Sequence, residues 1–143
     1  MPDVVNPVSI FVPMLVVLAL TFVVFIRMAA ARGAVAKQMD PNFYRAHLGG
    51  QEPEAARAAV RHYGNLLELP TVFYAACLTA FVVGAVGAWT LAFAWGYVGM
   101  RLVQSAVHIT YNNPAHRGMA FVVSVLFLLA LWINIGLSIC AQL

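Results

Sequence analysis

Three polar residues recur at helical spacing within an apolar stretch of the sequence: Arg61, Asn65 and Glu68. Intervals of four and three residues place a guanidinium, an amide and a carboxylate on one face of a helix. In a membrane span each ionisable group costs about 2.5 to 3.5 kcal/mol on insertion scales, so each needs a partner or a function. Two interpretations stay open: Arg61 and Glu68 pair through Asn65 and hold helices together, or the stripe belongs to a binding site.

A second polar stripe follows between positions 101 and 112, again with intervals of three or four residues. Arg117 comes just after the break at Asn113-Pro114. Together with Arg117, the two stripes hold three arginines against one glutamate. Surplus positive charge at membrane depth favours an anionic ligand, because guanidinium groups suit carboxylates and thiolates. We expect the stripes to face each other in the cytoplasmic half as a polar cleft. The members of the second stripe are Arg101, Gln104, Ser105, His108 and Tyr111 or Asn112.

The composition indicates a membrane protein. Of the 143 residues, 63% are hydrophobic and only 9% are charged, whereas an average soluble domain is about a quarter charged. The net charge of +3 is too small and too dispersed for a nucleic-acid partner. The two cysteines, Cys77 and Cys140, lie in apolar runs without disulfide or zinc spacing, and the histidines form no metal constellation.

Four apolar stretches are long enough to cross a bilayer, which takes roughly 20 residues of helix. Their approximate bounds are 8–27, 62–86, 89–111 and 117–140. The stretch 28–52 is richer in alanine, glycine and charge, and it predicts a cytosolic loop. The second helix should begin before its span, near Pro53, because proline is tolerated at the first helical position. The sequence therefore predicts an all-α integral membrane protein, a single four-helix transmembrane bundle.

The basic residues predict the orientation of this bundle. Six of the eight lie in or beside the first connection, and Arg101 and Arg117 bracket the connection between the last two helices. Cytoplasmic loops carry an excess of lysine and arginine. Both connections should therefore be cytoplasmic, with the N- and C-termini on the non-cytoplasmic side.

Three features resemble the MAPEG family, the membrane-associated proteins in eicosanoid and glutathione metabolism. They are the spacing Arg61-x-x-x-Asn65-x-x-Glu68 with Pro70 close behind, the basic stripe ending in Arg117, and the four-span plan at this length. The resemblance implies a homotrimer of four-helix subunits. It also implies that glutathione, as co-substrate, is bound between neighbouring protomers.

The resemblance further implies roles for individual residues. In the glutathione-using members, the residues matching Arg61, Asn65 and Glu68 hold the tripeptide, with Glu68 at its amino group. Arg117 is the match for an arginine that activates the thiol. A thiol of pKa about 8.5 is only a few per cent thiolate at neutral pH, and one desolvated guanidinium can stabilise the thiolate enough to lower that pKa. The candidate catalytic residue is Arg117, and the candidate glutathione-binding residues are Arg27, Arg32, Arg61, Asn65, Glu68, Arg101, Gln104, His108 and Tyr111.

Some positions depart from the family pattern. Gln104 and His108 stand where glutathione-using members have tyrosines, and Leu69 stands where an aromatic residue is usual. Arg27 or Arg32 matches an arginine at the cytosolic end of the first helix. The pattern at the end of the third helix is similar to a bacterial branch of the family, which implies a protein of the bacterial inner membrane.

Three hypotheses for the function follow. The leading one is a glutathione-dependent membrane transferase or peroxidase that acts on a lipophilic electrophile dissolved in the bilayer. The second is a non-enzymatic lipid-binding or scaffold trimer, since the family also contains a non-catalytic member. The third is a small proton-coupled transporter using Glu68 and His108, which the lack of a detectable internal repeat disfavours.

Overall fold

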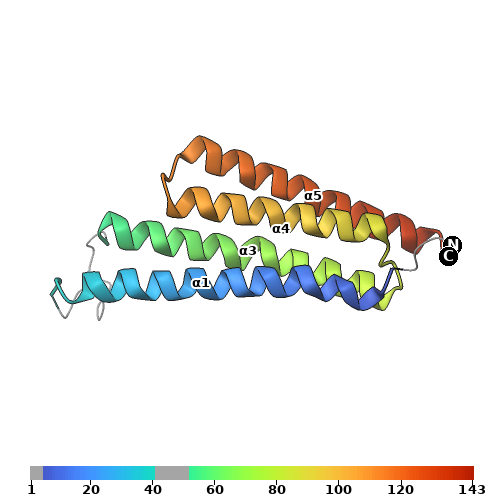
Figure 1. The fold of residues 1–143 in the computed structure, drawn as a ribbon, viewed down its shortest axis with the longest axis horizontal. Helices are drawn as coiled ribbons and strands as arrows, with labels where there is room; N and C mark the ends of the chain where they lie inside the picture. Colours follow the sequence, from blue (N-terminus) through green and yellow to red (C-terminus); the bar gives the residue numbers. More distant parts are fainter. Residues whose placement is uncertain (1–4, 41–51) are drawn as a thin grey trace. The chain divides into compact units, whose positions relative to one another are not determined.

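The computed structural model describes residues 5–40 and 52–143. Within these ranges the regular elements are all helices (Figure 1). They are the short 3-10 helix η1, Pro7–Ile10, followed by α1, Phe11–Ala36, α3, Glu54–Val82, α4, Ala88–Ile109, and α5, Pro114–Cys140. The all-α class and the four long helices predicted from the sequence are confirmed. Residues 41–51 of the predicted loop lie outside the described residues.

Three helices in the described part of the chain are long and apolar enough to cross a membrane. These are Pro7–Ala36, Glu54–Val82 and Pro114–Cys140. The remaining long helix, α4, has 22 residues and carries the second polar stripe, which lowers its hydropathy. The chain is thus an integral membrane protein.

The ends of the helices differ from the ends of the predicted spans. α1 extends to Ala36, well past the predicted end of the first span at residue 27. The added segment is rich in alanine, a strong helix former that continues a helix whether or not lipid surrounds it. α3 begins at Glu54, directly after Pro53 and close to the predicted start, with its acidic side chain in the first turn.

The chain divides into two compact units. The larger unit holds residues 1–18 and 69–143, and the smaller unit holds residues 19–68. α1 and α3 each contribute one segment to each unit. In the smaller unit the rings of Phe25 and Tyr63 join these two helices, with 5.5 Å between the ring centroids.

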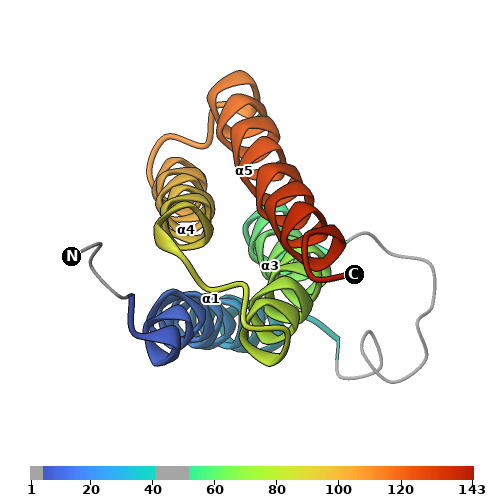
Figure 2. The same cartoon turned by 90° about the vertical axis from the view of Figure 1, so that its right-hand side faces the viewer.

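In the larger unit, α4 and α5 form an antiparallel hairpin and lie side by side (Figures 1 and 2). Buried side chains from every helix of this unit form one apolar core. Phe73 of α3 stacks on Tyr97 of α4 with ring centroids 4.4 Å apart. Phe11 of α1 meets Phe81 of α3 edge to face at 4.9 Å. These aromatic contacts fix α3 against both of its neighbours in the unit.

Hydrogen bonds at the α3–α4 link tie the start of α4 to α5. Gly84 ends α3 with φ +67°, a left-handed conformation that carries no steric penalty for glycine. Thr90 Oγ1 donates to the carbonyl oxygen of Ala85 at 2.6 Å, and Asn134 Nδ2 of α5 donates to Thr90 Oγ1 at 2.9 Å. The hairpin is therefore held by polar contacts at this end as well as by its apolar core.

Close packing of α4 on α5 makes Gly96 sensitive to substitution. A Cβ atom at Gly96 would lie 2.5 Å from the ring of Phe127, whereas a Cβ at Gly99 would meet no described atom within 4 Å. Without a clash, Gly→Ala in a helix stabilises by roughly 1 kcal/mol, but overpacking costs about 1 to 3 kcal/mol. We expect Gly96→Ala to lower, and Gly99→Ala to keep or raise, the melting temperature measured in detergent. Equal stabilisation by both variants would show that the two helices do not approach closely at Gly96.

Candidate functional site

The first polar stripe lies on α3 within the smaller unit. Arg61 and Glu68 are exposed, and Asn65 is half-buried. All three lie in the continuous helix of α3, so the shared face predicted from their spacing is present. Among the described residues, Arg61 and Glu68 take part in no hydrogen bond or ion pair. The smaller unit thus presents a guanidinium and a carboxylate on one face without pairing them to each other.

The two arginines in the second half of α1 differ in their contacts. Arg32 Nε donates to Glu52 Oε1 at 2.8 Å in an ion pair. Arg27 is exposed and makes no hydrogen bond or ion pair within the described part of the chain. Five residues separate the two positions, so their side chains leave α1 on different faces. Arg27 and Arg32 are equivalent candidates in the sequence, but among the residues that the structure describes only Arg32 of the two is engaged in an ion pair.

The second polar stripe lies on α4 in the larger unit, where Arg101, Gln104 and His108 are buried. Arg101 Nη1 donates to Gln104 Oε1 at 2.6 Å, one helical turn along. The guanidinium carbon of Arg101 also lies 5.9 Å from the ring centre of Phe121 on α5, which is a cation–π contact. The buried guanidinium of Arg101 is therefore in contact with an amide oxygen and with the face of an aromatic ring.

Arg117 lies in the first turn of α5 and is half-buried. Its Nη1 is 2.8 Å from Asn112 Oδ1 and 3.2 Å from His108 Nε2. A guanidinium has only donors, so the amide oxygen and the imidazole nitrogen must both accept. In the part of the chain that the structure describes, Nε and Nη2 of Arg117 make no hydrogen bond.

The turn between α4 and α5 brings these groups together. Asn112 has φ +47°, in the left-handed region that asparagine enters more readily than most residues. Its backbone nitrogen donates to the carbonyl oxygen of Val107 at 2.8 Å and so closes α4. The side chain of Asn113 caps α5 by accepting from the backbone nitrogens of Ala115 at 2.9 Å and His116 at 3.3 Å.

Tyr111, another predicted member of this stripe, takes a different partner. Tyr111 is exposed, and its Oη lies 3.0 Å from Nδ1 of His116, with an edge contact between the rings at 5.7 Å. The structure thus brings Arg101 together with Gln104 and Arg117 together with His108, but it places Tyr111 against His116 instead.

The helical spacing predicts Asn112 only as an alternative member of the stripe, and it does not predict the contact of Asn112 with Arg117. The signal was the run Tyr111-Asn112-Asn113-Pro114, because asparagines before a proline mark turns and helix caps. This run indicates that a side-chain oxygen lies near the start of the next helix. The run does not indicate which hydrogen-bond donor that oxygen contacts.

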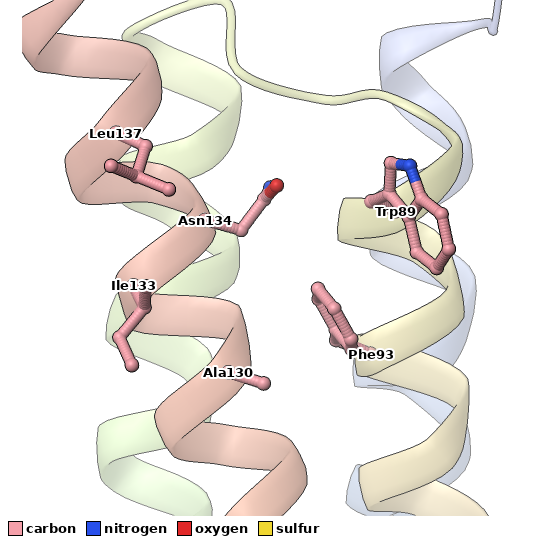
Figure 3. A pocket seen from close by; sticks show the side chains of 6 residues that line it. All are labelled: Trp89, Phe93, Ala130, Ile133, Asn134 and Leu137. Atoms are coloured by element: carbon pink, nitrogen blue, oxygen red, sulfur yellow. The ribbon is translucent and has the colours of Figure 1, made fainter.

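An apolar pocket of about 420 Å³ lies at the opposite end of the α4–α5 hairpin from Arg117 (Figure 3). Trp89 and Phe93 of α4 line one side, and the side chain of Asn134 projects from α5 on the other. None of the candidate site residues lines it. The complete lining is Trp89, Phe93, Ala130, Ile133, Asn134 and Leu137.

Comparison with known proteins identifies the family. A sequence model of the MAPEG family matches residues 10–137, nearly the whole chain. The matched region includes both polar stripes and Arg117. No curated protein and no solved structure matches the chain significantly. The extent of the family match shows that this four-helix integral membrane protein belongs to the MAPEG family.

Proposed function

We propose that this protein is a glutathione-dependent transferase or peroxidase that acts on a lipophilic electrophile held in the membrane. The active assembly is a homotrimer, with glutathione bound between neighbouring protomers. It resides in a bacterial inner membrane with both connections that carry arginine on the cytoplasmic side and both termini on the other. Membership of the MAPEG family, which includes glutathione transferases and peroxidases, supports this reading.

The observation that carries the proposal is the state of Arg117. Its guanidinium is held along one edge by two neutral acceptors, while Nε and Nη2 make no hydrogen bond among the described residues. A positioned guanidinium with remaining donors is suited to an anionic sulfur. Arg117 therefore stabilises the thiolate of bound glutathione and is the catalytic residue.

The chemistry of glutathione matches the remaining candidates. The tripeptide carries an ammonium group, two carboxylates and a thiol. Glu68 binds the ammonium group, Arg61 binds a carboxylate, and Asn65 lies between them as a hydrogen-bonding amide. Arg27 is the better candidate than Arg32 for a second carboxylate contact, because Arg32 is engaged with Glu52.

The reaction then follows from thiolate formation. The thiol proton leaves to water, and the sulfur lone pair forms a bond to an electrophilic carbon while the bond to the leaving group breaks. With a peroxide the sulfur attacks oxygen, the O–O bond breaks, and an alcohol departs. A second glutathione then displaces the oxidised sulfur's hydroxyl as water and gives glutathione disulfide.

Titration calorimetry of the purified protein with glutathione tests the proposal. We expect saturable binding, with at most one site per protomer. Turnover of a lipophilic electrophile should depend on added glutathione. Absence of any saturable binding would exclude a glutathione-dependent activity.

A second candidate is a lipid-binding protein without enzymatic activity, for which the pocket at Trp89 and Asn134 is the supporting observation. Its lining is almost entirely apolar, as expected of a surface that receives an acyl chain. The same purified protein separates the two candidates. A lipid that co-purifies in the mass spectrum, together with no glutathione binding and no turnover, would favour the second.

A further inference from the structure

Arg117 takes its position from the end of α4 and from the turn that follows it. We propose that Asn112 and His108 are the positioning residues of this guanidinium. They hold its Nη1 edge so that Nε and Nη2 face the thiol of glutathione. The proposal rests on the function proposed for Arg117 and names the residues through which that function depends on the α4–α5 turn.

Asn112 is suited to this task by its backbone as well as by its side chain. Its φ of +47° lies where most side chains are strained, while its backbone nitrogen closes α4 on Val107. In this conformation Oδ1 lies 2.8 Å from Arg117 Nη1, five residues along the chain. A glycine would keep the backbone conformation without penalty but would remove the acceptor. Position 112 therefore allows the acceptor to be deleted without disturbing the turn.

His108 provides the second acceptor from the last turn of α4. Because arginine cannot accept a hydrogen bond, the contact at 3.2 Å requires a lone pair on His108 Nε2. In this contact Nε2 accepts, which leaves Nδ1 as the ring nitrogen that can donate. The side chain of His108 is buried.

Both acceptors share one property, which is that neither carries a negative charge. A carboxylate in either place would hold the guanidinium equally well, but it would offset the positive charge that stabilises a thiolate. Two neutral acceptors restrain Arg117 and leave its charge available to the ligand. Asn112 and His108 therefore restrain the guanidinium of Arg117 without neutralising its charge.

The first measurement needs no ligand. The protein is labelled with nitrogen-15 in arginine, and the Nη signals of Arg117 are assigned by their loss in Arg117→Lys. In the wild type these signals should be resolved, because rotation about the Cζ–Nη bonds is slow. In Asn112→Gly and in His108→Phe the signals should average, because the guanidinium rotates faster once an acceptor is lost. Asn113→Ser is the matched control, because it keeps a capping side chain for α5 and leaves the contacts of Arg117 intact.

The second measurement is the thiolate absorbance of bound glutathione in ultraviolet difference spectra, together with kcat and KM. Asn112→Gly should lower the thiolate fraction and kcat by about tenfold with little change in KM, since misplacement of a catalytic group affects the rate more than binding. Asn112→Asp retains an acceptor that tolerates the left-handed backbone but adds a negative charge. It should keep Arg117 restrained in the NMR spectrum and still lower the thiolate fraction.

The outcomes separate this proposal from the proposed function. If Arg117→Ala loses the thiolate while Asn112→Gly and His108→Phe keep it, Arg117 is catalytic and the positioning proposal is wrong. Unchanged Nη signals in Asn112→Gly and His108→Phe would overturn it even without glutathione. If the wild type forms no thiolate at saturating glutathione, the proposed function fails, and the NMR result alone decides whether the two residues hold Arg117. Melting temperatures of all variants identify any that fail to fold.

Discussion

Replacing Arg117 by alanine is expected to leave glutathione bound and to remove most of its thiolate. If the guanidinium lowers the pKa of the bound thiol from about 8.5 to about 6.5, the thiolate fraction at pH 7 falls from about three quarters to a few per cent in the variant. The corresponding loss of thiolate stabilisation is about 2.7 kcal/mol. The rate should fall in proportion, roughly 25-fold at pH 7, because the thiolate is the attacking species.

Difference absorbance of the thiolate and calorimetry with glutathione measure the two effects separately. S-methylglutathione has no ionisable thiol, so its affinity should be the same for Arg117→Ala and for the wild type. Lys37→Ala removes another positive charge, at an exposed position after α1, and serves as the charge control. Undiminished thiolate absorbance in Arg117→Ala would mean that another group activates the thiol.

Replacing Glu68 by glutamine should weaken glutathione binding with little effect on the bound thiol. The substitution keeps the size of the side chain and removes the charge that we propose binds the ammonium group of the ligand. A hydrogen bond between charged groups contributes enough that its loss raises Kd by roughly tenfold to a hundredfold. The thiolate fraction at saturation should be unchanged, because the contact proposed for Glu68 is with the ammonium group and not with the sulfur.

Calorimetry with two ligands tests the pairing directly. N-acetylglutathione lacks the ammonium group, so it should bind the wild type about as weakly as glutathione binds Glu68→Gln, and the two changes should not add. Glu54→Gln alters an exposed carboxylate at the start of the same helix and controls for net charge. Additive losses from the two changes would show that Glu68 contacts some other part of the ligand.

The helices were predictable because a bilayer imposes a simple rule on sequence. An apolar run of sufficient length must be helical, since no other open structure satisfies its backbone hydrogen bonds in lipid. The residues at which the helices end were less predictable. The segment up to Ala36 is helical because of its alanine content, although its charge and small residues mark the end of a span.

The candidate residues were also predictable as stripes, because helical periodicity determines which side chains share a face. The partners of these side chains were not. Ligand binding by His108 and Gln104 stays a prediction, and in the structure each of them contacts an arginine of the same unit. Tyr111 leaves the stripe altogether and pairs with His116.

The membrane class, the four helices and the faces on which the polar residues lie follow from the amino-acid sequence alone, because they depend on composition and on a fixed helical period. The contacts of Arg117 with Asn112 and His108 are visible only in the folded chain, because they depend on the left-handed backbone of one residue in a turn and on how closely α5 returns along α4. Periodicity describes one helix at a time, whereas the position of a guanidinium depends on two helices and the turn between them.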